Sequence, residues 1–205
     1  MYDYHKYHVI TLTIFDSFEM ADLWYAPQGY NAYTKNFWER GNPQESSGQN
    51  LTNSYSPSNV WGTALSEAGR VIVTGKRGNR SYLYSPIIDI ALIQPDTLSF
   101  QMAANLAQGS KVTLEYYDYL GQWQKVDAPD VENWYNNDEG RHFDGNTANY
   151  GYVNYFFKTS LIRGNFQQRI QFRFVYETEK GSNANSSYGE GCNIDNFHIG
   201  RGQRD

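Results

Sequence analysis

The sequence has a single cysteine, Cys192, among its 205 residues. No intrachain disulfide is therefore available, and a chain of this length can bury a stable core without one. A lone cysteine is most often a small buried packing residue. No local pattern around Cys192 supplies the base that a nucleophilic thiol would need. We therefore expect a packing role for it.

Long apolar runs and basic patches are also missing. No apolar run approaches the ~18 residues that a transmembrane helix needs, and residues 1–20 contain no apolar stretch typical of a signal peptide. We therefore expect no membrane insertion, and a mature form or an excised domain if the protein is secreted. The net charge of −5 gives no electrostatic reason to expect a nucleic acid partner.

Catalytic motifs are absent as well. Neither HExxH nor GxSxG occurs. His5 and His8 stand three residues apart, which places them on opposite faces of a strand and argues against a zinc site. Glu115 and Asp118, the nearest candidates for a glycosidase pair, have the same spacing and the same problem. We expect no enzyme activity, and a polysaccharide-active hydrolase or lyase is the distant alternative.

Aromatic residues are abundant, at 17% of the chain with 18 tyrosines. Aromatics favour pleated, half-buried surfaces, although the same excess could line a binding face. Apolar and polar residues alternate with period two in most segments, and no segment is convincingly helical. Strands are expected in about nine places, with one interrupted at Pro86: 8–15, 60–65, 70–75, 81–92, 96–106, 111–126 as a hairpin around Leu120-Gly121, 152–161, 168–179 and 192–200. This pattern predicts an all-β sandwich or barrel.

The last of these segments, "CNIDNFHIG" (192–200), does not alternate strictly. Phe197 and Ile199 share one face of a regular strand, whereas Ile194 is offset from them. Two explanations are open. The strand contains a bulge near Asn196, or both of its faces are buried as in an inner strand.

Six segments occur in an order that resembles a known family. They are "FDSFEMADLW" (15–24), "FWERGNPQ" (37–44), "NVWGTAL" (59–65), "SYLYSPIIDI" (81–90), "EYYDYLGQWQKV" (115–126) and the closing pair "RIQFRFVYET" and "YGEGCNIDNFHI" (169–178 and 188–199). Together they are similar to the MAM-related jelly-roll module of the concanavalin A-like group, found in secreted and cell-surface bacterial proteins, especially in Bacteroidota. The resemblance implies one two-sheet antiparallel β-sandwich of the jelly-roll type over 1–205. It also implies an extracellular or cell-surface location and attachment to a larger protein such as a peptidase or adhesin.

Three carboxylates are candidates for a metal site: Asp16, Glu19 and Asp195. They would meet at one end of a sandwich whose first and last strands pair, and Ca²⁺ prefers hard oxygen ligands of this kind. The resemblance implies that such acids bind a structural Ca²⁺ in some members. The alternative is that these carboxylates cap turns or accept hydrogen bonds from backbone amides.

Two long stretches, 25–58 and 127–150, look like loops, and long loops in a compact domain are usually functional or disordered. Carbohydrate modules stack sugars on exposed aromatic rings and orient them with polar side chains. Candidates of this kind are Tyr33 in the first loop and Trp134, Tyr135, Asn136, Asn137 and Asp138 in the second. They predict a non-catalytic module that binds polysaccharide or surface glycans. The alternative is a structural module that contacts other domains of a parent protein, and burial of Trp134 and Tyr135 would favour it.

Overall fold

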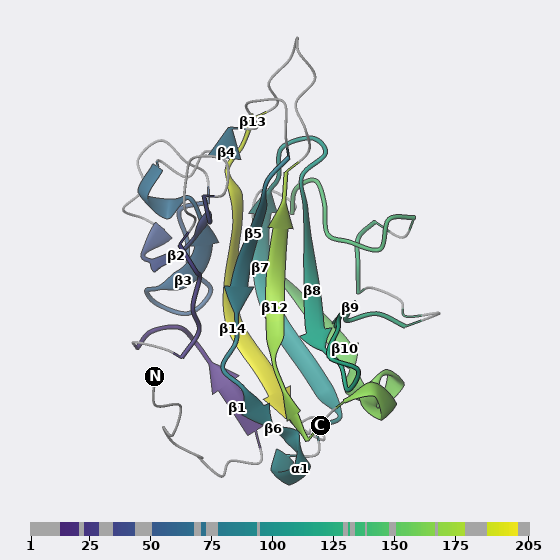
Figure 1. Ribbon diagram of the computed structural model, residues 1–205. Coiled ribbons are helices and arrows are strands. Elements are labelled where there is room, and N and C mark those ends of the chain that lie inside the picture. Colours follow the sequence, from purple (N-terminus) through teal and green to yellow (C-terminus); the bar gives the residue numbers. More distant parts are fainter. Residues whose placement is uncertain are drawn as a thin grey trace.

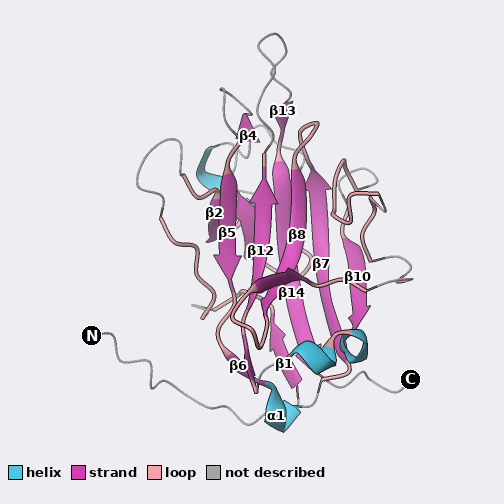
Figure 2. Ribbon diagram, turned by 45° about the vertical axis from the view of Figure 1, so that its right-hand side comes forward, coloured by secondary structure: helices cyan, strands magenta, loops and turns pink. Residues whose placement is uncertain are grey.

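The computed structural model describes residues 13–20, 23–28, 35–43, 51–67, 71–72, 78–93, 95–128, 131, 134–137, 139–147, 151–166, 168–178 and 188–200. Most of the described secondary structure is β-strand. The helical pieces are short: α1 (Ile90–Ile93) and 3₁₀ turns at Leu65–Glu67, Thr159–Leu161 and Arg163–Asn165. Figure 2 shows the helical turns at the periphery of the strands. Within these residues no helix is long and apolar enough to cross a membrane.

Two antiparallel sheets form the body of the molecule (Figure 1). The six-stranded sheet contains, in spatial order, β10 (Val153–Lys158), β7 (Thr97–Asn105), β14 (Gly191–Gly200), β3 (Val60–Thr63) and β2 (Trp38–Gly41), with β1 (Thr13–Asp16) also paired to β14. The four-stranded sheet contains β5 (Arg80–Tyr84), β12 (Phe172–Glu177), β8 (Lys111–Tyr117) and β9 (Trp123–Lys125). Two small pairs join β6 (Ile88–Asp89) to β11 (Arg169–Ile170) and β4 (Val71–Ile72) to β13 (Tyr188–Gly189).

The chain passes repeatedly from one sheet to the other. It runs from β7 to the β8–β9 hairpin, back to β10, across to β12 and back again to β14. This is an antiparallel β-sandwich of the jelly-roll type, so the predicted fold class is confirmed. The predicted interruption at Pro86 is also present, because β5 ends at Tyr84 and β6 begins at Ile88.

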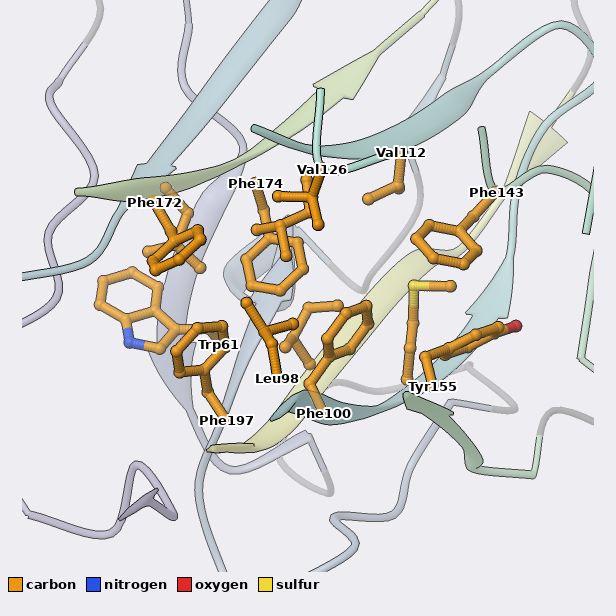
Figure 3. Packing of buried hydrophobic residues seen from close by; sticks show 14 of the residues in the cluster. Trp61, Leu98, Phe100, Val112, Val126, Phe143, Tyr155, Phe172, Phe174 and Phe197 are labelled. Carbon is orange, nitrogen blue, oxygen red and sulfur yellow. The ribbon is translucent and has the colours of Figure 1, made fainter. Parts of the chain in front are cut away.

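Aromatic rings fill the space between the sheets (Figure 3). Phe100 of one sheet meets Phe174 of the other edge to face, with ring centroids 4.9 Å apart. Trp24 contacts Phe197 in the same manner, also at 4.9 Å. Edge-to-face pairs of this kind add about 0.5–1.5 kcal/mol each beyond the area that they bury. The high aromatic content is therefore explained first by the packing of the core.

The closing strand β14 has the bulge that was one of the two explanations for its irregular pattern, and residues 191–195 are also buried on both faces. Its register against β7 shifts between Asp195 and His198, and Asn196 adopts a left-handed φ of 49°. Asparagine tolerates this conformation better than most residues. The shift allows Ile194, Phe197 and Ile199 all to be buried. It also separates the half of β14 that pairs with β3 from the half that pairs with β1.

Candidate ligand-binding face

Asp195, one of the predicted metal ligands, is fully buried beside the bulge. Its Oδ2 accepts hydrogen bonds from the backbone N–H groups of Tyr55 and Ser56, at 2.9 and 2.8 Å. Its Oδ1 accepts from the Ser56 hydroxyl and from the N–H of Asn196. Burial raises the pKa of Asp195 above its ordinary value, although these hydrogen bonds act in the opposite direction.

The second predicted ligand, Glu19, holds the neighbouring part of the same segment. Its carboxylate accepts hydrogen bonds from the backbone N–H groups of Ser58 and Asn59, at 2.5 and 3.0 Å. Asp16 accepts instead from the N–H of Phe18, at 2.9 Å, and burial raises its pKa. The structure therefore brings Glu19 and Asp195 to one common segment, residues 55–59, which leads into β3.

This arrangement does not fit a cation. Four backbone N–H groups direct the positive ends of their dipoles at the Glu19 and Asp195 carboxylates, where calcium would need oxygen ligands. Within the described part of the chain, no group of three or more His, Cys, Asp or Glu side chains could hold a metal ion. The hydrogen-bonding alternative therefore accounts for these contacts. The prediction of a structural Ca²⁺ is untested.

The loop aromatics predicted to stack on a ligand lie in the core. Trp134 is fully buried and Tyr135 is 4% exposed. The Trp134 indole donates a hydrogen bond to the Val126 carbonyl at 2.6 Å and packs against Phe157 with ring centroids 5.1 Å apart. The prediction that these two rings bind sugar is wrong, because the segment folds back and contributes them to the space between the sheets. As far as this loop is concerned, their burial favours the structural alternative.

The polar candidates in the same loop are used to fold it. Asn136 exchanges two hydrogen bonds with the backbone of Asp144, and Asn137 donates to the Asp144 carboxylate at 2.7 Å. Asn137 also accepts from the N–H of Gly140. The remaining candidates, Tyr33 and Asp138, lie outside the described residues. In its described part, the predicted binding loop is therefore folded and is anchored to the core.

A different set of rings lies on the outward face of the four-stranded sheet. This sheet is in front of the six-stranded sheet in Figure 1. Side chains alternate across a strand, so the residues next to the buried ones point away from the core. The aromatic face defined in this way consists of Tyr25, Tyr82, Tyr84, Tyr117 and Trp123.

The rings of the aromatic face form a continuous series. Tyr25 stacks on Tyr84 with ring centroids 5.2 Å apart and planes within 14° of parallel. Tyr84 contacts Trp123 at 5.7 Å, and Trp123 contacts Tyr117 at 5.2 Å. Tyr82 lies 6.0 Å from Tyr84 on the same strand. Tyr25 is 50% and Tyr117 40% exposed, and the other three rings are partly exposed. The series therefore presents aromatic surface to solvent.

Arg173 of β12 lies at the centre of this series. Its guanidinium carbon is 4.1 Å from the Trp123 ring centroid, 4.7 Å from that of Tyr82 and 5.9 Å from that of Tyr84. Glu115, its cross-strand partner on β8, accepts a hydrogen bond from Arg173 Nε at 2.7 Å and forms an ion pair with Nη2 at 2.6 Å, both through Oε2. The cation–π contacts and the ion pair with Glu115 together restrict the position of the arginine side chain. We expect the rings around it to be correspondingly well ordered.

Asp118 fixes the hairpin that carries Trp123. Its Oδ1 accepts hydrogen bonds from the N–H groups of Leu120 and Gln122, and its Oδ2 accepts from the Gln124 side chain. Gly121 completes the turn with a left-handed φ of 77°. Burial raises the pKa of Asp118, but the hydrogen bonds outweigh it and hold the pKa below its ordinary value. The predicted hairpin around Leu120-Gly121 is confirmed.

Glu115 and Asp118 do not form a catalytic pair. Glu115 is bound to Arg173 on the outward face, whereas Asp118 is occupied within the turn. A glycosidase needs two carboxyls that face each other across the scissile bond. The odd spacing of these two residues in the sequence therefore agrees with where the structure places them.

The aromatic face was missed because its residues are spread over three strands and a loop. A local signal was nevertheless present in "RSYLY" (80–84), where Tyr82 and Tyr84 alternate with the buried Ser81 and Leu83. Two aromatic residues in the polar phase of a strand place two rings on its solvent side. Which other strands supply neighbours depends on sheet order, which no local pattern contains.

No known family model matches this sequence, and no curated protein sequence matches it. Among solved structures, the K1 adhesin domain of Lys-gingipain from Porphyromonas gingivalis W83 is 13% identical over 93% of this chain and 98% of that chain, with a TM-score of 0.46. A family 61 carbohydrate-binding module in complex with β-1,4-galactotriose is 13% identical over 82% and 91%, with a TM-score of 0.40. The C-terminal family 22 carbohydrate-binding module of Clostridium thermocellum Xyn10B is 13% identical over 91% and 92%, with a TM-score of 0.42. At these TM-scores neither a ligand nor a family is carried over to this chain, and the resemblance to MAM-related modules stays a prediction.

Proposed function

We propose that this chain is a non-catalytic glycan-binding module and that the aromatic face is its binding surface. The observation that carries the proposal is the series of five partly exposed rings around Arg173. A sugar ring presents an apolar C–H face and a polar rim. Exposed aromatic surfaces with a few fixed polar groups are complementary to such a ligand.

Order in the free protein supports the same proposal. Each side chain that must be immobilised on binding costs about 0.5–1.5 kcal/mol. Trp123 is held between Arg173, Tyr84 and Tyr117 before any ligand arrives, so little of that cost should remain. A preformed surface of this kind suits a ligand that is itself flexible and offers only weak contacts per sugar unit.

The biological setting in this proposal follows from the sequence resemblance. We place the module outside the cell or at the cell surface, as an accessory to a larger secreted protein or adhesin. In that setting the aromatic face would bring the parent protein to a polysaccharide.

The proposal is tested by replacing Trp123 with alanine and titrating soluble polysaccharides by calorimetry. Trp123 contacts Tyr84, Tyr117 and Arg173, so its removal opens the centre of the aromatic face. Loss of a central aromatic contact typically costs at least about 2 kcal/mol, so we expect affinity to fall about thirtyfold.

The matched control is Phe156→Ala. Phe156 is 47% exposed and lies on β10 of the other sheet, so its removal also deletes a half-exposed ring. It should leave affinity unchanged. Circular dichroism and melting of both variants separate lost binding from lost folding. Equal affinity of a folded Trp123→Ala variant and the wild type would exclude the aromatic face as the glycan-binding surface.

A further inference from the structure

The outward face of the four-stranded sheet carries more cations than anions. Its outward-pointing charged residues are the cations Arg80, Lys111, Lys125 and Arg173 and the anions Glu115 and Glu177. This is an excess of two positive charges, on a chain whose net charge is −5. The aromatic face therefore lies in a locally basic part of an acidic molecule.

Both anions of this face are already engaged. Glu177 accepts from Arg80 at 2.8 Å and from Lys111 at 3.2 Å, so two cations share one carboxylate. Glu115 is bound to Arg173. The outward-facing groups of these strands that can donate a hydrogen bond to a ligand are the N–H groups of arginine and lysine and the hydroxyls of Tyr82, Tyr84 and Tyr117, and the positive charges outnumber the negative ones.

Lys125 is the outward-pointing cation on the strand that carries Trp123, and it stands opposite Glu115 in the register of β8 and β9. It lies two residues after Trp123 on β9, on the same face and about 7 Å further along the strand. Its ammonium group donates to the backbone carbonyls of Gly140 and Arg141, both at 3.2 Å. Carbonyl oxygens carry no net charge, so these contacts leave the charge of Lys125 available to a ligand.

We infer that the aromatic face selects anionic polysaccharides, whose carboxylate or sulfate groups meet Lys125 and the Arg80–Lys111 pair while sugar rings cover the aromatics. The inference rests on the proposed glycan-binding function and adds the class of glycan. A neutral sugar would find the rings and the tyrosine hydroxyls but would gain nothing from the excess of positive charge. An anionic sugar finds rings together with donors of the opposite charge.

The experiment compares two matched pairs of soluble polymers. The first pair is polygalacturonate and its carboxyl-reduced neutral counterpart, and the second is dextran sulfate and dextran. Surface charges contribute modestly and are screened by salt. We expect the wild type to bind an acidic polymer about tenfold more tightly than its neutral partner at low ionic strength, with the difference shrinking as salt is added. Selectivity in the first pair alone would show that the face recognises carboxylate groups. Selectivity in the second pair alone would show that it recognises sulfate groups.

A pair of charge variants distinguishes a local effect from the overall charge. Lys125→Gln should lower affinity for the acidic polymer about two- to fivefold and affinity for the neutral one by less, because a neutral sugar meets the ammonium only through hydrogen bonds. Lys158→Gln is the control, because Lys158 is exposed on β10 of the other sheet and its removal changes the net charge equally. It should have no effect on either polymer.

Three outcomes would contradict the inference that the aromatic face selects anionic polysaccharides. Equal affinity for the acidic and neutral members of both pairs would refute anionic selectivity and leave the proposed function intact, provided that Trp123→Ala abolishes the binding. Equal losses in Lys125→Gln and Lys158→Gln would also refute it, since only net charge would then matter. Absence of wild-type binding to all four polymers would overturn the proposed function and this inference together.

Discussion

Single carboxylates organise residues 55–59, the segment that leads into β3. Asp195 and Glu19, which are far apart in the sequence, bind successive backbone N–H groups of residues 55–59. A carboxylate that accepts several N–H groups replaces the pairing that an irregular segment lacks. That these acids lie near one another was predictable from the pairing of first and last strands, although Asp195 lies in the middle of β14 and not at an end of the sandwich. The hydrogen-bond partners of these acids were not predictable, because the segment 55–59 has no periodic pattern that would fix its position in the fold.

This use of the carboxylates leads to a prediction on metal removal. We expect EDTA to leave the melting temperature unchanged, because backbone donors already satisfy both carboxylates. A calcium ion present at a hundred times its Kd would contribute about 2.7 kcal/mol. For a chain of this length that is about 5–11 °C in melting temperature. A decrease of this size, reversed by added calcium but not by magnesium, would establish the metal site and contradict the expectation.

At the scale of elements, the β8–β9 hairpin places two groups of the binding face on the edge strand of the four-stranded sheet. Trp123 and Lys125 lie on a strand of only three residues, whose position depends on the turn before it. Asp118 holds that turn through the N–H groups of Leu120 and Gln122. The turn was predictable, because Leu120-Gly121 interrupts two alternating segments. The capping role of Asp118 depends on the exact turn geometry, which the alternation does not specify.

The lowered pKa of Asp118 gives a pH dependence with a definite sign. The ionised form is favoured in the folded state, so its contribution to stability is present above the ordinary pKa of 3.8 and is lost as pH falls through the folded value. We therefore expect the stability gap between wild type and Asp118→Asn to narrow as pH falls from 6 to 3. Urea unfolding of both proteins across this range measures the gap. A gap that stays constant or widens toward acid would contradict the role given to the carboxylate.

The two binding surfaces considered for this chain show where sequence patterns stop being informative. Strands were found because period two reports which side of a strand is buried. Trp134 was misplaced because its loop has no period, and its burial involves contacts with Phe157 of β10 and with Val126, which follows β9. Arg173 and Glu115 meet because β12 and β8 are neighbours, although 57 residues lie between them in the chain. Such pairs follow from sheet order, which composition and periodicity leave open.

At the scale of the whole molecule, Cys192 reports on the integrity of the sandwich. It is fully buried on β14, a central strand of the six-stranded sheet, and burial raises the pKa of its thiol above the ordinary value. Its N–H donates to the Thr63 hydroxyl of β3 at 3.0 Å. Exposure of this thiol therefore requires β14 to separate from its neighbours.

We accordingly expect Cys192 to be unreactive toward a thiol reagent such as DTNB in the native protein and fully reactive in guanidinium chloride. The native reaction rate should follow the opening of the core, since a buried thiol reacts only from an open state. Rates measured against denaturant and extrapolated to water provide the check. Complete labelling within seconds under native conditions would show that β14 is accessible and would contradict its central position.

The division of β14 between two partners has a consequence for self-association. On the side away from β7, residues 193–194 pair with β3 and residues 197–200 pair with β1. Pairing between segments so distant in sequence is slow to close, so β1 should dock late in folding. Until it does, the half of β14 rich in Phe197 and Ile199 has unpaired N–H and C=O groups, a template on which another chain can add a strand. β1 carries none of the binding rings, yet it is the short strand that keeps this edge closed to other copies.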